Sequence, residues 1–247
     1  MPILEKLQPQ AVFAQFEQLC AIPHGSGNTK AISDYLVRFA AARGLRHIQD
    51  KYNNVIIFCP GTPGYEAAAP VILQGHMDMV CETAPDCAKD MTSEGLDLFV
   101  DGDTIGARGT TLGGDDGIAV AMALAILDAD DIPHPPLEVV LTVDEETGML
   151  GADALDASVL QGRTMLNLDS EDEGILTVSC AGGAHAAAHI EMHANECALD
   201  SAEIRISGLK GGHSGAEIDK GRANATITLG RVLQALVDEL EVRIVSA

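Results

Sequence analysis

Residues 71–78 read Val71-Ile72-Leu73-Gln74-Gly75-His76-Met77-Asp78. A short, continuous apolar run of this kind is typical of a strand buried in the middle of a sheet. The run ends in two polar side chains, His76 and Asp78, which are two positions apart and therefore project to the same side of an extended chain. The stretch predicts a central strand that brings an imidazole and a carboxylate to one edge of a sheet.

Segments on both sides of this strand alternate between helical and extended patterns. The predicted elements are helices over 12–20, 32–40 and 116–127, strands over 55–58, 137–143 and 164–168, and a hairpin over 98–105 with its turn at Asp101-Gly102. This order predicts an α/β sandwich whose central sheet is largely parallel.

The sequence pattern changes after Gly182-Gly183. The predicted elements beyond this point are extended segments over 184–192, 202–206 and 242–245 and a long helix over 223–240. A segment of this βαβ-like order is typical of the opening part of a second domain. We therefore predict one domain over 1–182 and the first part of another over 183–247.

Acidic residues dominate the charge of the chain. It contains 15 Lys and Arg against 37 Asp and Glu, which gives a net charge of −22. Such a chain repels phosphate backbones and anionic membrane surfaces, and it attracts metal ions and cationic substrates. The longest mostly apolar stretch, 118–127, is about half of the roughly 20 residues that span a bilayer. Neither a nucleic acid nor a membrane is therefore an expected partner.

The N-terminus and the cysteines predict a cytoplasmic protein. The first residues lack the basic start and the apolar run of a secretory signal. The six cysteines are scattered along the chain without a CxxC motif, which favours reduced thiols over a disulfide framework.

His76 and Asp78 form a pair that has a specific use at a metal site. The imidazole can bind a metal ion while the carboxylate fixes the tautomer of the ring. A histidine near a strand end is, by itself, more often an ordinary surface or core residue. The pair therefore needs support from other motifs.

The segment 106–117 is rich in glycine and carries two adjacent acids, Asp115 and Asp116, before an apolar helix. Asp116 could serve as the N-cap of that helix, which accounts for one carboxylate but not for two. Glycine lets the backbone approach a ligand closely, and a carboxylate at this position could bridge two cations. A phosphate-binding loop is disfavoured because the GK[ST] sequence is missing and the local charge is negative.

Two further predicted strands end in acids, one before Asp144-Glu145-Glu146 and one before Asp169. Open α/β sheets place their sites at the carboxyl ends of strands, so the four motifs together favour a shared metal site over separate solvated turns. Histidine and carboxylate ligands without cysteine are typical of catalytic zinc, with Mn²⁺ or Co²⁺ as substitutes. Because Glu145 is next to Glu146, it is placed to take a proton from metal-bound water, which indicates hydrolysis.

Taken together, the motifs resemble a known family. They are Gly75-His76-Met77-Asp78-Met79-Val80, Ala107-Arg108-Gly109-Thr110-Thr111-Leu112-Gly113-Gly114-Asp115-Asp116-Gly117, Thr142-Val143-Asp144-Glu145-Glu146-Thr147-Gly148, Asn167-Leu168-Asp169-Ser170-Glu171 and Gly208-Leu209-Lys210-Gly211-Gly212-His213-Ser214-Gly215. The chain resembles the Xaa-His (aminoacyl-histidine) dipeptidases, carnosinase-like members of the co-catalytic zinc peptidases that include aminoacylase and glutamate carboxypeptidase. The resemblance runs from about Pro9 to the end of the sequence.

The resemblance implies a fold and a metal site. The fold is a three-layer α/β/α catalytic domain with a mostly parallel central sheet, followed by the start of a smaller α+β lid and dimerisation domain. The site holds two divalent metal ions, most simply Zn²⁺. His76 and Asp169 would bind one of them, Glu146 would bind the other, and Asp115 would bridge the two.

The resemblance also implies roles in catalysis. Asp78 would orient His76, and Glu145 would be the general base in the hydrolysis of small peptides, namely Xaa-His dipeptides. His213, in the smaller domain, would contact the carbonyl or carboxylate of the substrate, across a homodimer interface formed by the lid. A cis peptide bond would join Asp115 to Asp116.

One implied ligand has no counterpart in this sequence. The family has a further histidine ligand near its C-terminus, beyond the position that corresponds to Ala247. We therefore expect this chain alone to bind one metal ion tightly and a second at most weakly, and to show little or no activity.

Two other classes of function stay open at the sequence level. A truncated or non-catalytic metal-binding relative that acts as an interaction protein would keep the sheet and lose turnover. A glycosidase with an acidic pair is more remote, because it leaves His76 and the order of the motifs unexplained. The preferred N-terminal residue of the dipeptide, the physiological metal and the oligomeric state are left open by the sequence.

Overall fold

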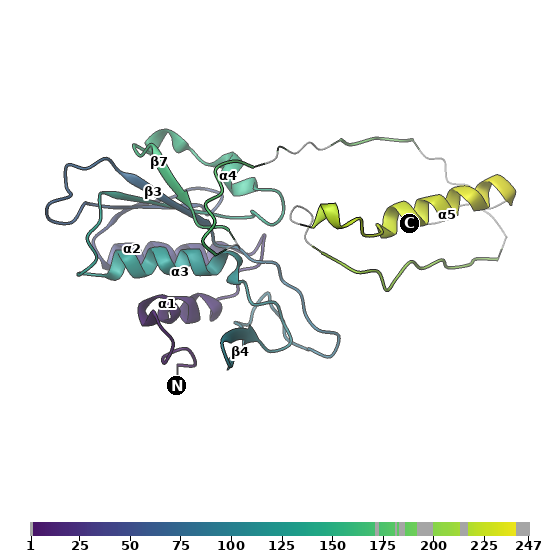
Figure 1. Cartoon of the computed structure of the whole chain (residues 1–247), viewed down its shortest axis with the longest axis horizontal. Coiled ribbons are helices and arrows are strands. Elements are labelled where there is room, and N and C mark those ends of the chain that lie inside the picture. Colours follow the sequence, from purple (N-terminus) through teal and green to yellow (C-terminus); the bar gives the residue numbers. More distant parts are fainter. Residues whose placement is uncertain are drawn as a thin grey trace. The chain divides into compact units, whose positions relative to one another are not determined.

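The chain forms two units, Met1–Cys180 and Ala181–Ala247, which we describe separately. A computed structural model describes residues 2–170, 173–180, 182, 186–191, 200–212 and 217–240. Figure 1 shows the first unit as a sheet with helices packed against it. The assignment of 1–182 to a catalytic domain and of 183–247 to a lid stays a prediction.

A five-stranded sheet forms the centre of the first unit, with the strand order β1-β2-β6-β3-β7. The strands are β1 (Arg46–Gln49), β2 (Val55–Cys59), β3 (Val71–His76), β6 (Leu137–Thr142) and β7 (Thr164–Asn167). β3 is parallel to both β6 and β7, whereas β2 is antiparallel to β1 and to β6. Four of the five strands therefore point in the same direction, so the predicted mostly parallel sheet is confirmed.

The central strands are mostly apolar because both faces of the sheet are covered. In β2, Val55 and Ile57 belong to the core on one face, while Ile56 and Phe58 belong to the core on the other. All six residues of β6 are buried. A strand that is covered on both faces is a continuous apolar run rather than an alternating one, which is the pattern that predicts these strands from the sequence.

Helices α2 (Lys30–Ala42) and α3 (Gly114–Asp128) cover one face of the sheet, and α1 (Gln10–Cys20) packs against α3 (Figure 1). The opposite face carries a thinner layer, made of α4 (Leu150–Ala154) and the 3₁₀ turn Ala157–Val159. These helices confirm the predicted α/β class, with layers on both faces of the sheet.

The predicted hairpin is formed by β4 (Leu98–Asp101) and β5 (Thr104–Ala107), and it lies outside the main sheet. Its turn residues are Gly102 and Asp103, one position beyond the predicted Asp101-Gly102, because Asp101 still pairs with Thr104. Gly102 has a φ of +61°, which favours glycine. Two elements of this unit were not predicted. β1 contributes a single strongly apolar residue, Ile48, and α4 is five residues long, so neither has a readable period.

The second unit contains the 3₁₀ turn Ile218–Lys220 and helix α5 (Ala225–Glu239). Asn224 caps α5, because its side chain accepts a hydrogen bond from the Ile227 N–H at 3.0 Å. The helix predicted over 223–240 is therefore confirmed.

The predicted strands of this unit are not confirmed. The segment over 202–206 forms no strand, nor do residues 186–191 of the predicted strand over 184–192, while 242–245 lies outside the described residues. A strand needs a hydrogen-bonded neighbour for its backbone groups, and the described part of this unit contains no second strand to supply one. An extended pattern alone was therefore insufficient for these predictions.

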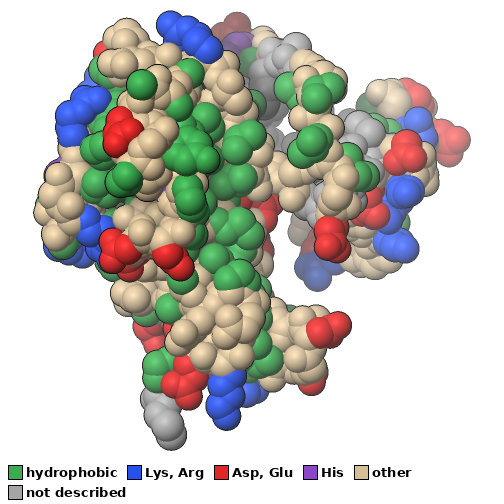
Figure 2. Space-filling model, turned by 60° about the vertical axis from the view of Figure 1, so that its left-hand side comes forward, with side chains coloured by type: hydrophobic (Ala, Val, Ile, Leu, Met, Phe, Trp, Pro, Cys, Tyr) green, Lys and Arg blue, Asp and Glu red, His purple; other side chains and the backbone are tan. Residues whose placement is uncertain are grey.

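None of the described helices has the length and apolar character needed to cross a membrane. On the face drawn in Figure 2, acidic and basic side chains are interspersed with apolar and uncharged ones.

Candidate metal centre

The carboxyl ends of β3 and β6 lie side by side, since His76 is the register partner of Thr142. Asp78 follows the first strand and Asp144-Glu145-Glu146 follows the second. Parallel strands place their carboxyl ends at one edge of the sheet, which explains why residues far apart in sequence meet there.

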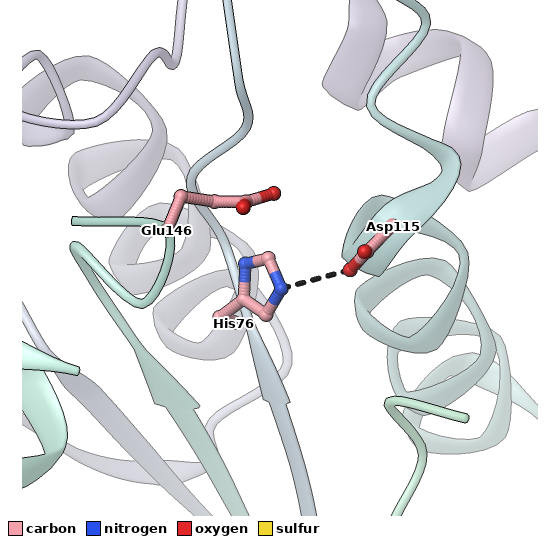
Figure 3. A group of neighbouring side chains, drawn as sticks. All are labelled: His76, Asp115 and Glu146. Atoms are coloured by element: carbon pink, nitrogen blue, oxygen red, sulfur yellow. Dashed lines mark hydrogen bonds and ion pairs between the residues drawn. The ribbon is translucent and has the colours of Figure 1, made fainter. Parts of the chain in front are cut away.

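Three side chains meet at this edge: His76, Asp115 and Glu146 (Figure 3). One possible ligand atom from each lies within 4.8 Å of the other two, and His76 Nε2 is 3.0 Å from Asp115 Oδ1. The imidazole is buried, while both carboxylates are exposed. One nitrogen and two carboxylate groups form a donor set that suits a catalytic zinc ion.

The charges of the site also suit a cation. Burial raises the pKa of Glu146, and the negative charge of Asp115 raises it further. Like charges held close together disfavour ionisation, and a bound cation would relieve this repulsion. The residues present therefore fit the metal ion that the sequence predicts.

His76 is held in a defined orientation by Asp78. Its Nδ1 lies 3.0 Å from the backbone oxygen of Asp78 and 3.5 Å from the carboxylate Oδ1 of the same residue. A proton on Nδ1 leaves Nε2, which faces Asp115, available as a ligand atom. Burial alone lowers the pKa of His76, but the hydrogen bond and charge of Asp78 outweigh it and raise this pKa to about 10. A bound cation would therefore have to displace a proton from this ring.

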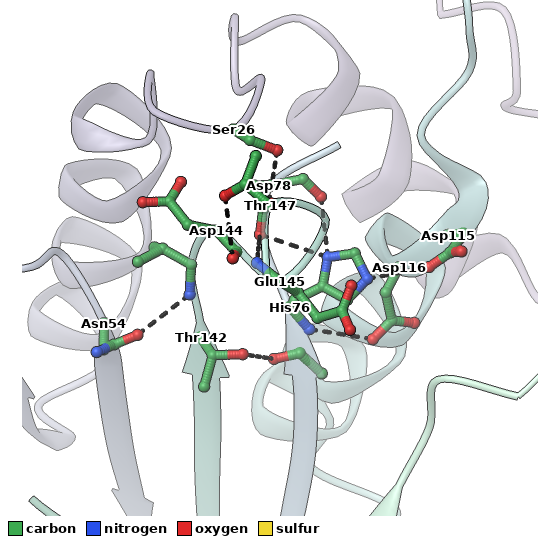
Figure 4. A network of polar contacts seen from close by, with 12 residues as sticks. Ser26, Asn54, His76, Asp78, Asp115, Asp116, Thr142, Asp144, Glu145 and Thr147 are labelled. Carbon is green, nitrogen blue, oxygen red and sulfur yellow. Dashed lines mark hydrogen bonds and ion pairs between the residues drawn. The ribbon is translucent and has the colours of Figure 1, made fainter. Parts of the chain in front are cut away.

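Asp78 is itself fixed by several donors (Figure 4). Its Oδ2 accepts a hydrogen bond from the Ser26 hydroxyl at 2.8 Å, and its Oδ1 accepts one from the Glu145 N–H at 3.2 Å. Burial opposes ionisation of this carboxyl, but the hydrogen bonds from His76 and Ser26 hold its pKa below the usual value. Asp78 is therefore a charged carboxylate that joins the imidazole to the turn carrying Glu145.

The acidic turn that follows β6 is closed at its base. The Val143 N–H donates to Asn54 Oδ1 at 3.1 Å, and the Gly151 N–H donates to the Val143 carbonyl oxygen at 3.0 Å. Within the turn, the N–H of Met149 donates to the carbonyl of Glu145 at 2.9 Å. Burial raises the pKa of Glu145, and the neighbouring His76 partly offsets this effect. A raised pKa moves a carboxylate toward the range in which it can accept and return a proton.

Helix α3 begins irregularly at its two acids. The peptide bond between Asp115 and Asp116 is cis, as the resemblance implies, and the backbone angles of both residues are non-helical. Asp115 is directed toward His76, as Figure 3 shows.

Asp116 does not cap the helix, so the N-cap interpretation is wrong. Its buried carboxylate crosses to the neighbouring strand, where Oδ2 accepts a hydrogen bond from the His76 N–H at 3.1 Å. Burial raises the pKa of Asp116 to about 7. The second acid therefore supports the strand end instead of the helix.

The family model described as Peptidase family M20/M25/M40 matches residues 72–243. The chain belongs to this family. The resemblance predicted from the motifs is thereby confirmed.

Two similar proteins show how much of an M20/M25/M40 peptidase the chain represents. The cytosol non-specific dipeptidase of Escherichia coli (strain K12) is 39% identical over 247 residues, which cover 99% of this chain and 51% of that protein. The crystal structure of aminoacylhistidine dipeptidase from Vibrio alginolyticus matches with a TM-score of 0.69 and 35% identity, covering 98% of this chain and 50% of that one. The chain therefore spans about half the length of these relatives.

A third match is more distant. The crystal structure of a tripeptidase from Staphylococcus aureus has a TM-score of 0.56 and 26% identity, and the match covers 67% of this chain and 44% of that one. Peptidases of the M20/M25/M40 family are metal-dependent, and this member contains a group of residues that could hold a metal ion.

The group of three leaves out one predicted metal ligand of this family member, Asp169. Asp169 is exposed and comes two residues after Asn167, which pairs with Gln74. It is near enough to contribute to the raised pKa of Asp116 and of Glu145. Its role as a ligand stays a prediction, as does the substrate contact of His213, which lies outside the described residues.

Three residues at the site were not predicted in the roles that they have. Ser26, Asn54 and Asp116 each support a residue at a strand end through one hydrogen bond. The sequence signal for Ser26 is its place between two glycines, which indicates a tight turn. Asn54 has no comparable local signal.

Proposed function

We propose that this M20/M25/M40 peptidase hydrolyses dipeptides, with Xaa-His dipeptides as its substrates, at a centre of two divalent metal ions, most simply Zn²⁺. The observation that carries the proposal is the convergence of His76, Asp115 and Glu146 within 4.8 Å. Two similar proteins, a dipeptidase and an aminoacylhistidine dipeptidase, support the choice of substrate class.

The residues of the centre are either metal ligands or residues that orient a ligand. His76 and Asp169 are the proposed ligands of one ion, Glu146 is a ligand of the other, and Asp115 bridges them. Divalent ions in such a centre polarise the scissile carbonyl and lower the pKa of water. Asp78 keeps the proton of the imidazole on Nδ1, so that Nε2 stays a ligand atom.

Glu145 is the proposed general base. It lies between Asp144 and Glu146 in the closed acidic turn, and its N–H is held by the Asp78 carboxylate at 3.2 Å. Its carboxylate accepts a proton from the attacking water and delivers it to the leaving amine. The raised pKa of Glu145, caused chiefly by burial, suits both halves of this exchange.

The remaining parts of the proposal concern the rest of the protein. His213 contacts the carbonyl or carboxylate of the substrate, and the region over 183–247 acts as a lid through which two copies form a homodimer. The protein works in the cytoplasm, in agreement with the word cytosol in the name of the Escherichia coli relative.

The alternative function is that of a metal-binding relative that lacks turnover and acts as an interaction protein. It shares the group of three possible ligands with the peptidase. The same metal centre serves both functions, and only an activity measurement separates them.

Zinc titration of the metal-free chain tests the centre. We expect one tight site, which is lost in His76→Ala and Asp115→Ala. His47→Ala is the matched control, because this histidine lies in β1 and outside the group of three. A chain without tight zinc uptake, or a tight site that survives His76→Ala, contradicts the proposed centre.

A hydrolysis assay with zinc then separates the two functions. The wild-type chain should release histidine from β-alanyl-histidine. A fall in this rate by about 100-fold or more in Glu145→Gln, with zinc uptake unchanged, supports the peptidase. Glu66→Gln, an exposed acid outside the group of three, is the control. Because little activity is expected of this chain, the assay uses enough protein to detect slow turnover, and zinc uptake with no zinc-dependent release at all supports the interaction protein. A rate of about 1 per second or more contradicts the expectation of little activity for this chain.

A further inference from the structure

A short segment near the N-terminus lies beside the metal centre and is held there by its backbone. Gly25 forms a parallel bridge with Met79, the residue that follows Asp78. The Met79 N–H donates to the carbonyl of His24 at 3.2 Å, and the Ser26 N–H donates to the carbonyl of Met79 at 3.2 Å. The position of Ser26 is therefore fixed before its side chain makes any contact.

The side chain of Ser26 is directed at Asp78, as Figure 4 shows. Its hydroxyl donates to Oδ2 of this buried carboxylate at 2.8 Å, while Oδ1 receives the Glu145 N–H and lies 3.5 Å from His76 Nδ1. The two oxygens thus have different partners. Loss of the hydroxyl would free Oδ2 and allow the carboxylate plane to rotate away from the imidazole.

The same segment also holds the acidic turn. The Gly27 N–H donates to Asp144 Oδ1 at 2.6 Å, and Asp144 has a φ of +55° in the left-handed region. The two glycines that flank Ser26 suit this close approach. A Cβ on Gly25 would lie 2.5 Å from Cys81 Sγ, and Gly27 has a φ of +77°.

We infer that Ser26 is a positioning residue of the metal centre, which acts through Asp78 to fix the imidazole of His76 and the turn that carries Glu145 and Glu146. Neither the comparisons nor the motifs assign a role to this serine. The inference rests on the proposed function, since it needs a metal ion at His76.

Zinc affinity of the metal-free chain tests this inference. Loss of an outer partner of a metal ligand typically weakens affinity by about 10- to 100-fold, and we expect Ser26→Ala to raise the Kd for zinc by about tenfold. Ser26→Thr keeps a hydroxyl and should restore most of the affinity. Ser93→Ala is the matched control, because the Ser93 hydroxyl also donates to a carboxylate, Asp90 Oδ2 at 2.7 Å, in an exposed turn. It should leave the Kd unchanged.

Two further measurements separate positioning from simple stability. Urea unfolding in EDTA reports the stability of each metal-free variant, and a merely structural serine would lower that stability without changing the Kd of the folded chain. If Ser26→Ala does not fold, Ser26→Cys removes the strong donor at nearly the same volume and should also weaken zinc binding. If folded Ser26→Ala or Ser26→Cys binds zinc with the wild-type Kd, the inference is overturned and the proposed function is left intact. A wild-type chain that takes up no zinc overturns both.

Discussion

Two buried carboxylates next to His76 have opposite pKa shifts, which shows how single residues set the chemistry of this site. Burial opposes the charge of both. Asp78 accepts hydrogen bonds from Ser26 and Glu145 in addition to its contact with the imidazole, and its pKa is lowered. Asp116 has fewer compensating donors, and burial raises its pKa to about 7. Hydrogen bonds to the charged form therefore decide which carboxylate stays ionised.

His24 should make the stability of the metal-free chain depend on pH. Burial lowers its pKa below 6.5, and the hydrogen bond to the Ile22 carbonyl offsets this only in part. The folded state therefore disfavours the protonated ring. The stabilising contribution is present above pH 6.5 and is lost as the pH falls through the lower pKa of the folded state.

The measurement is urea unfolding in EDTA at pH 7.5 and 5.0. We expect His24→Gln to lose less stability than the wild type between these two values. His47→Gln is the control. The Nδ1 of His47 contacts the carbonyl oxygen of Leu45, two residues earlier, at 2.9 Å, as His24 contacts that of Ile22, but His47 is less buried than His24. An equal loss in wild type and His24→Gln would show that another group carries the pH dependence.

At the scale of elements, the acidic turn is tied at its base by hydrogen bonds to a residue from another part of the chain. Asn54 receives the Val143 N–H and donates to the carbonyl of Gly151 at 2.9 Å, so one buried amide joins both ends of the turn. Asn54 also donates to Asp50 Oδ2 at 2.7 Å. The two glutamates of the turn are therefore held by the residue that precedes β2 as well as by their own strand, β6.

Gly151→Ala should open this turn. A Cβ at residue 151 would collide with the carbonyl oxygen and nitrogen of Val143, both of which are backbone atoms that cannot move independently. Overpacking of this kind costs about 1–3 kcal/mol of unfolding free energy, and we expect weaker binding of the second zinc ion because its ligand Glu146 is displaced. Gly230→Ala in α5 is the control, since a Cβ there would meet no atom within 4 Å. Unchanged stability and zinc affinity in Gly151→Ala would show that the turn is open in solution.

At the scale of the whole molecule, the two units differ in how their helices are stabilised. Helix α3 buries Val120, Ala121 and Leu124 completely against the sheet and α1. None of the described side chains of α5 is buried, although the helix has 15 residues. Most helical stability in proteins comes from packing of an apolar face, and an isolated helix of this length is marginal in water.

Hydrogen exchange should therefore separate α5 from α3. We expect the amides of Ala225–Glu239 to exchange well before those of Ala119–Leu124 in the wild-type chain. Peptide-resolved mass spectrometry makes the comparison within one sample. Equal protection of both helices would mean that α5 is covered in solution.

Zinc should stabilise the first unit without protecting α5. A ligand present at about 100 times its Kd stabilises the folded state by about 2.7 kcal/mol. We expect an increase of this size in urea unfolding of the wild type, and none in His76→Ala. The same exchange experiment with zinc should show slower exchange around His76 and Glu146 and an unchanged rate in α5. Zinc-dependent protection of α5 would contradict this.

The sequence by itself determined the class of fold and the residue types of the site. The apolar runs of β2, β3 and β6 predict buried strands, because a strand that is covered on both faces carries apolar residues at successive positions. The sequence indicates His76, Asp115 and Glu146 because each lies within three residues of an end of a predicted element. Local patterns sufficed here, since burial and strand ends are properties of short stretches.

Only the tertiary structure decided the order β1-β2-β6-β3-β7 and the supports of the site. Ser26 contacts Asp78 across 52 positions, Asn54 contacts Val143 across 89, and Asp116 contacts His76 across 40. The local sequence around each of these residues does not predict which distant residue it contacts. The direction of a buried donor or acceptor is set by the packing of the elements that carry it. This packing directs Asp116 to the end of β3, where it accepts a hydrogen bond from the His76 N–H instead of capping its own helix.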